Sequence, residues 1–126
     1  MTFTDEKSYV KVAKFLDIFC VADKYLWINL EMFLMKKEKM FSPKSYVEIM
    51  SHFASQSEGS RDFYDFYEFN YTSKWYDKLS THDFISLGYN FYMVHAGTIN
   101  FFSMYCDALL NRLDDSTSTY DLLRVL

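Results

Sequence analysis

The sequence predicts an all-α fold: a bundle of five to seven helices around one long central helix near residues 82–113. Every long segment shows helical periodicity, with apolar residues recurring at steps of three and four beside polar stripes. Two helix-start signals and one clear polar loop divide the chain between these segments. Its 126 residues fit one domain, 1–126, which is large enough to bury a core without a staple.

Two helices are expected in the first forty residues. Thr4 is an N-cap candidate for the first helix. A polar stripe at helical spacing follows it, formed by Lys7, Lys11, Lys14 and Asp17. The stripe breaks phase at Asp23, so either the helix kinks there or Asp23 caps a second helix. The next segment, residues 25–40, is apolar nearly all round, which predicts burial on several sides.

A third helix is expected from Pro43 to about Gln56. Ser42 can cap its first turn, and a Pro at the first helical position lacks only an N–H that would have no helical partner. Residues 55–60 then form the one clear polar loop, and Ser60 can cap the helix that follows.

The most distinctive segment is the acid–aromatic run of residues 62–71. A helix would place Asp62, Asp65 and Glu68 on one third of its circumference, whereas a strand would scatter these acids over both faces. Phe and Tyr also favour strands, but the grouping of the acids favours a helix. We expect this helix to break near residue 70 and a short turn to follow at residues 74–79.

The last long helix is expected to begin at Ser80, with Asp83 three residues later as in a capping box. Unbroken over 82–113, it would be about 48 Å long. Its apolar side has the four-three spacing of a seam packed against other helices. That seam contains Gly88, Phe91, His95 and Thr98. A turn near 114–118 and a short helix over 120–126 end the chain, and no repeat of solenoid length is recognisable.

Composition favours a cytoplasmic protein that does not bind nucleic acid directly. The formal charge of −4 opposes binding to phosphates and mildly favours a basic partner through electrostatic steering. Cys20 and Cys106 lie in apolar runs, as expected of buried thiols in a reducing compartment. No signal peptide is recognisable. Residues 84–106 lack charged side chains, but their polar side chains favour a buried helix over a membrane span.

No motif predicts catalysis, a cofactor or a metal. The chain lacks a Gly-rich phosphate loop, a nucleophile elbow and a paired-Cys zinc motif. Glu48 and His52 have a spacing that can bind metal, but no second copy of the pattern exists, so a surface ion pair is the simpler interpretation. We therefore expect a non-enzymatic protein.

The leading hypothesis is a small acidic protein that binds and blocks another protein, as a bacterial immunity protein or a phage or viral anti-defence protein does. Aromatic residues are enriched at protein interfaces. The residues expected to contact the partner are Asp62, Asp65, Glu68, Phe69, Thr72 and Tyr76. The simpler interpretation of this run is a helix with solvated acids and core rings.

Two alternatives come from other classes of protein. In the first, the bundle holds a small apolar ligand in an internal pocket lined by Gly88, Phe91, His95 and Thr98. His95 would then be a polar anchor, whereas the simpler interpretation is a buried, hydrogen-bonded histidine. In the second, the protein is a structural subunit of a larger assembly. An exposed aromatic patch would favour partner binding or assembly, and an internal cavity would favour the ligand.

Overall fold

Six α-helices account for most of the described residues, which in this computed structural model are 6–36 and 41–113. The helices are α1 (Glu6–Ile18), α2 (Lys24–Lys36), α3 (Pro43–Ser55), α4 (Arg61–Asn70), α5 (Thr81–Met93) and α6 (Ile99–Leu113). A π-helical turn, Tyr71–Trp75, continues α4. The described ranges contain no strand, so the all-α prediction is confirmed. The features expected at Thr4, 114–118 and 120–126 lie outside these ranges.

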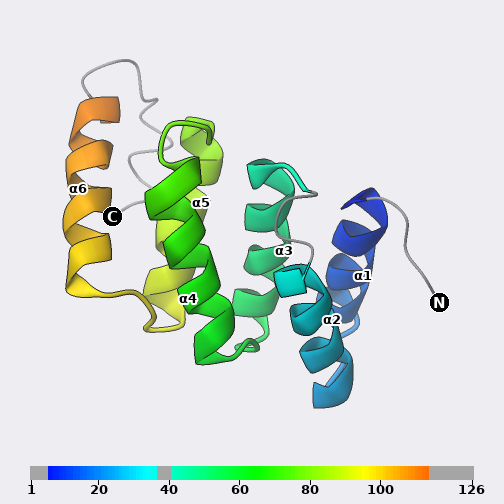
Figure 1. Cartoon of the computed structure of the whole chain (residues 1–126). Coiled ribbons are helices and arrows are strands. Elements are labelled where there is room, and N and C mark those ends of the chain that lie inside the picture. Colours follow the sequence, from blue (N-terminus) through cyan, green and yellow to red (C-terminus); the bar gives the residue numbers. More distant parts are fainter. Residues whose placement is uncertain (1–5, 37–40, 114–126) are drawn as a thin grey trace.

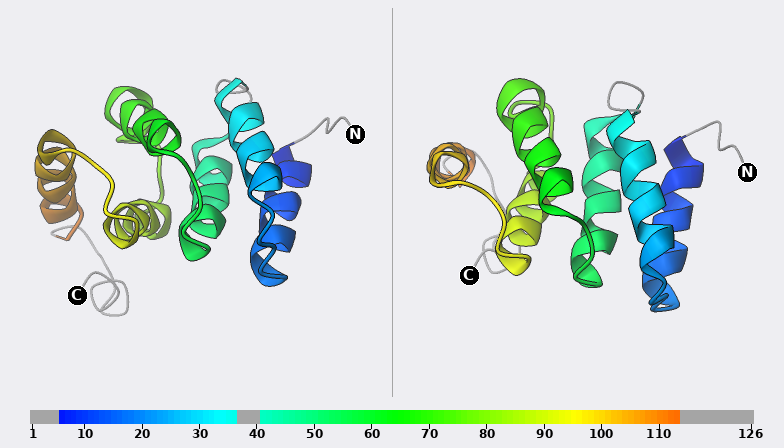
Figure 2. Two further views of the ribbon diagram at one scale, coloured as in Figure 1. Left: turned by 90° about the horizontal axis from the view of Figure 1, so that it is seen from below. Right: turned by 60° about the horizontal axis from the view of Figure 1, so that its bottom comes forward.

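The helices form three consecutive hairpins that stack in a row, from α1 and α2 at one end to α6 at the other (Figure 1). The first helices of the hairpins pack in series, α1 against α3 and α3 against α5. The second helices α2 and α4 also pack together. The helices therefore lie in two layers, which are seen most clearly from below (Figure 2).

The three hairpin loops share a residue in the left-handed backbone conformation. Each contains one residue other than Gly with positive φ: Cys20 at 48°, Ser57 at 55° and His95 at 57°. Ser57 lies 37 residues after Cys20, and His95 lies 38 residues after Ser57. These left-handed residues end the first helix of each hairpin.

The hydrogen bonds that end the first helices are also equivalent. The residue after each left-handed residue donates its N–H to the carbonyl five positions earlier, at 2.8–3.0 Å. The accepting carbonyls belong to Leu16, Phe53 and Phe91, which are all buried. This six-to-one bond is typical of the Schellman motif.

The second helices anchor their hairpins through ring donors at equivalent positions. Trp27 Nε1 donates to the carbonyl six residues earlier, and so does the Tyr64 hydroxyl. The Tyr67 and Tyr105 hydroxyls each donate to a carbonyl 21 residues earlier, on the first helix of their own hairpin. The described residues thus form three tandem helix–loop–helix repeats, an architecture of the helical-repeat class.

These repeats are not recognisable in the sequence. The residues that share a core position in the three repeats share burial but rarely residue type. Ala13, Met50 and Gly88, for example, occupy the same buried position of α1, α3 and α5. Comparison of residue letters cannot detect such a repeat, because packing requires only apolar groups of complementary size.

The predicted continuous central helix is wrong. The chain turns between Met93 and Ile99, so that α5 and α6 are separate helices. Gly97, with a φ of 95°, takes part in the turn together with His95. The four-three spacing continues across the loop because both helices pack their apolar sides against the same core, and this conceals the break.

The predicted helix starts are confirmed. The side chains of Ser42, Ser60 and Ser80 each accept the backbone N–H three residues later. Asp23 caps α2, since its Oδ1 accepts the N–H of Tyr25 at 2.9 Å. Cys20 and Cys106 are free and exposed, so their predicted burial is wrong.

Candidate functional site

The surface that best fits a binding role lies on α2 and α4, two second helices that pack side by side. Three pairs of residues occupy equivalent positions on these helices, 37 residues apart, and all six are exposed. We call this surface the outer face; its residues are Tyr25, Ile28 and Met32 of α2 and Asp62, Asp65 and Phe69 of α4. Tyr25 and Phe69 are 78% and 62% exposed.

Asp62, Asp65 and Phe69 were expected at a partner surface, and the structure places them in the outer face. Asp62 and Asp65 lie on the first and second turns of α4, and Arg61 Nε is 4.0 Å from an Asp65 oxygen. Both partners of this pair are well exposed, and such pairs contribute little to stability. The two acids are therefore available for contacts with another molecule.

Glu68, also expected at the partner surface, is half-buried and forms a contact between two repeats. Its two carboxylate oxygens accept the backbone N–H and the hydroxyl of Thr98, each at 2.9 Å. The Thr98 hydroxyl in turn accepts the N–H of Phe101 in the first turn of α6. Glu68 therefore links the second repeat to the start of the third, and Thr98 is a capping residue.

The same link joins the first repeat to the second. Glu31 of α2 accepts the N–H of Ser60 at 2.8 Å and also its hydroxyl. Ser60 caps α4 as Thr98 caps α6. The sequence shows Glu31 as an acid in an apolar segment, but this signal alone does not reveal its partner.

Thr72 and Tyr76 have different environments. The Thr72 hydroxyl donates to the carbonyls of Glu68 and Phe69, within its own helical segment, and the residue is half-buried. Tyr76 follows the π-helical turn directly and is 49% exposed. Tyr76 is thus available at the surface, whereas the Thr72 hydroxyl is used in hydrogen bonds to backbone carbonyls.

Most of the remaining rings of the acid–aromatic run form part of the core. Phe63, Tyr64 and Tyr67 are buried, and the Phe63 ring contacts each of the two tyrosine rings edge to face. Burial, together with the negative charges of Glu31 and Glu58, raises the pKa of Tyr64. Burial likewise raises the pKa of Tyr67 well above its usual value. Both phenols therefore stay protonated and donate to backbone carbonyls.

The contribution of α2 to the outer face was not predicted from the sequence. Residues 25–40 were expected to be buried on several sides because they are apolar nearly all round. In the described part of this segment, Tyr25, Ile28 and Met32 are all at least 47% exposed. The prediction is wrong because this side of α2 lies on the outside of the stack, as does the equivalent side of α4, where Asp62, Asp65 and Phe69 are also exposed.

None of the depressions described among residues 6–36 and 41–113 is lined by all four residues proposed for a ligand pocket. Gly88 is buried beneath the ring of Tyr105, and Phe91 is buried against Phe101. His95 is exposed in the hairpin loop, so the prediction that it lies in a buried seam is wrong. His95 lines two described depressions, of about 360 and 400 Å³, and neither is lined by Gly88 or Phe91.

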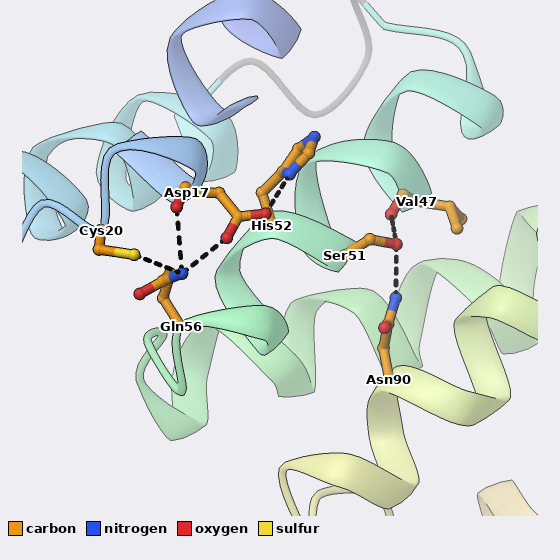
Figure 3. A network of polar contacts seen from close by, with 7 residues as sticks. All are labelled: Asp17, Cys20, Val47, Ser51, His52, Gln56 and Asn90. Atoms are coloured by element: carbon orange, nitrogen blue, oxygen red, sulfur yellow. Dashed lines mark hydrogen bonds and ion pairs between the residues drawn. The ribbon is translucent and has the colours of Figure 1, made fainter. Parts of the chain in front are cut away.

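Polar side chains also connect the first helices (Figure 3). His52 Nδ1 lies 2.7 Å from Asp17 Oδ2, and Gln56 Nε2 donates to Asp17 Oδ1 at 2.7 Å. Asn90 donates to the Ser51 hydroxyl at 2.8 Å, and Ser51 donates to the carbonyl of Val47. These contacts join α3 back to α1 and α5 back to α3.

His52 is therefore engaged by Asp17, 35 residues away, and the expected pairing with Glu48 is replaced by this contact. Burial by itself would raise the pKa of Asp17. The hydrogen bonds from His52, Gln56 and Ser55, together with the charge of His52, outweigh burial and lower that pKa. Within residues 6–36 and 41–113, no three His, Cys, Asp or Glu side chains are grouped as metal ligands.

The fold and the outer face define a small helical-repeat protein with an exposed apolar and acidic surface. None of the helices in residues 6–36 and 41–113 is long and apolar enough to cross a bilayer. Comparison with known proteins gives no match: no protein-family model, no curated protein and no solved structure is significantly similar to the chain.

Proposed function

We propose that the protein acts by binding another protein through its outer face and thereby blocks that partner. The observation that carries this proposal is the exposure of Tyr25, Met32 and Phe69 on two adjoining helices. Large apolar side chains grouped on the surface of a soluble protein mark sites of interaction. Helical-repeat proteins use such extended surfaces, formed by neighbouring repeats, to bind other proteins.

The chemistry of the outer face favours a basic partner. Phe69 and Met32 occupy equivalent exposed positions on the two helices, and their apolar side chains can fill pockets of the partner. Asp62 and Asp65 flank them on α4, and the whole chain has a formal charge of −4. Acids at the rim would accelerate encounter with a positively charged surface, while buried apolar side chains would slow dissociation.

The test is affinity capture with the wild-type protein and a double variant, Met32→Ser with Phe69→Ser. The matched control is Ile18→Ser, because Ile18 is as exposed as Phe69 but lies on a first helix. We expect a captured protein that is retained by the control and depleted at least about tenfold with the double variant, as loss of one hot spot would produce. Circular dichroism establishes that all variants remain folded.

The captured protein is then purified, and its own activity is titrated with the wild type and the variants. Blocking predicts inhibition by the wild type and by Ile18→Ser, and loss of inhibition by the double variant. Equal capture by all three proteins would exclude the outer face as the binding site. Capture without inhibition would contradict blocking while leaving binding intact.

A further inference from the structure

The two junctions between repeats show which positions of a repeat face the preceding one. On the first helix of the second repeat, His52 and Gln56 reach back to Asp17 in the first repeat. On the first helix of the third repeat, Asn90 reaches back to Ser51 in the second. Because Asn90 lies 38 residues after His52, the two residues occupy the same position and face the same way.

In the first repeat these positions hold exposed phenylalanines. Phe15 lies 37 residues before His52 and is 56% exposed, and Phe19 lies 37 residues before Gln56 and is 65% exposed. Their ring centroids are 4.6 Å apart. The first repeat therefore has an apolar pair where the second repeat has polar side chains in contact with its neighbour.

The second helix shows the same pattern. Leu26 is 46% exposed, whereas its equivalents Phe63 and Phe101 are completely or almost completely buried. Phe33 is 50% exposed, whereas its equivalent Asn70 is buried. We call this surface of the first repeat the leading face; its residues are Phe15, Phe19, Leu26 and Phe33. It lacks the polar side chains that usually cover the terminal repeat of a solenoid.

The opposite end of the stack is also apolar and exposed. Tyr92 of α5 occupies the position of Asp17, which contacts the next repeat, and is 69% exposed. Leu110 of α6 occupies the position of Thr72 and is 61% exposed. We call this surface of the third repeat the trailing face; its residues are Tyr92, Cys106 and Leu110.

The polar residues of the two end faces are compatible with each other. At both junctions a glutamate of the preceding repeat accepts hydrogen bonds from a hydroxyl residue that caps the next second helix. The leading face has Asp23 at the capping position, and a glutamate opposite it would bring two carboxylates together. The trailing face has neutral Cys106 at the glutamate position, so this repulsion is absent.

We propose that a second copy of the chain stacks head to tail on the first, the trailing face of one copy covering the leading face of the next. The contact would follow the geometry of the two junctions within the chain, with Cys106 opposite Asp23. Such a contact is heterologous, so each added copy leaves one free leading face and one free trailing face, and assembly grows with concentration.

The experiment measures molar mass by size-exclusion chromatography with light scattering over a range of protein concentrations. We expect the wild-type mass to rise above that of the monomer as concentration increases. Leu26→Asp on the leading face and Leu110→Asp on the trailing face should each hold the protein as a monomer, because each disables one side of the contact. Phe69→Asp, on the outer face, should assemble as the wild type does.

An equimolar mixture of Leu26→Asp and Leu110→Asp separates head-to-tail stacking from other contacts. One intact leading face and one intact trailing face remain in the mixture, so we expect a dimer that does not grow further. Helical circular dichroism must be the same for all variants. A wild type that is monomeric at every concentration would overturn the proposal. So would a Leu110→Asp variant that assembles normally, or a mixture that gives no dimer.

Because Phe69→Asp alters the outer face and spares both end faces, the assay also separates this proposal from partner binding. If the wild type captures a partner but does not assemble, only the proposal of head-to-tail stacking is contradicted. If the wild type assembles but captures no partner through the outer face, only the proposal of partner binding is contradicted.

Discussion

The junction between the first and second repeats and the junction between the second and third share one contact and differ in the rest. Both use a glutamate that accepts the N–H and the hydroxyl of a capping residue. The first junction adds the charged contact of Asp17 with His52, whereas the second adds the neutral contact of Asn90 with Ser51. Two junctions with equivalent backbone geometry can therefore differ in the strength and in the pH dependence of their electrostatic contacts.

The two junctions differ in the burial of the shared glutamate as well. Glu31 is 7% exposed, whereas Glu68 is half-buried. Hydrogen bonds to a charged group contribute more where water is excluded, because the local dielectric is lower. Loss of the carboxylate should therefore cost more at the first junction than at the second.

The largest expected effect tests the packing within the third repeat, beyond the second junction. A Cβ at Gly88 would lie 2.1 Å from Cζ and from the hydroxyl oxygen of Tyr105, a buried side chain that stacks on Phe84. We expect Gly88→Leu to lower the free energy of unfolding by about 3 kcal/mol or more through overpacking. Denaturant unfolding followed by circular dichroism measures this change.

The double variant Gly88→Leu with Tyr105→Ala provides the control for overpacking, because the truncated ring leaves space for the new side chain. The loss of unfolding free energy in the double variant should be smaller than the sum of the losses in the two single variants. Strictly additive losses would mean that the two side chains do not compete for the same volume.

An intermediate effect compares the two glutamates directly. We expect Glu31→Ala to cost about 2 kcal/mol of unfolding free energy and Glu68→Ala about 1 kcal/mol, within the range for hydrogen bonds to charged groups. Denaturant unfolding of both variants under one buffer condition measures the difference. Equal costs would show that burial does not distinguish the junctions, and a larger cost at Glu68 would reverse the comparison.

The smallest effect is the pH dependence of the first junction. The pKa of Asp17 is lowered from its ordinary value of 3.8, so its ionised form is favoured in the folded state. The resulting stability is present above the unfolded pKa and is lost as the pH falls through the lower, folded pKa. We expect this loss to be below about 1 kcal/mol, as for most pairs near a surface.

Thermal unfolding of the wild type and of Asp17→Asn, from neutral pH to below pH 3.8, measures this dependence. The stability difference between the two proteins should shrink as the pH falls. The control is Ser51→Ala, which alters the neutral junction and should differ from the wild type by the same amount at every pH. A constant difference for Asp17→Asn would contradict the proposed coupling.

Local features of this fold could be predicted from the sequence. The starts of α3, α4 and α5 follow from Ser42, Ser60 and Ser80, because an N-cap acts on N–H groups only two or three residues away. The helical state of the acid–aromatic run follows from the spacing of its acids. The exposure of Asp62 and Asp65 follows from their place on the polar side of that helix.

Tertiary structure decided the break at His95, the role of Glu68 and the exposure of α2. An apolar seam looks the same whether one helix continues or two helices pack against one core, so the turn could not be read from spacing. Glu68 and Thr98 are 30 residues apart, and only the stacking of repeats brings them together. Burial depends on neighbours, so Phe63 is buried inside the stack while the equivalent Leu26 is exposed at its end.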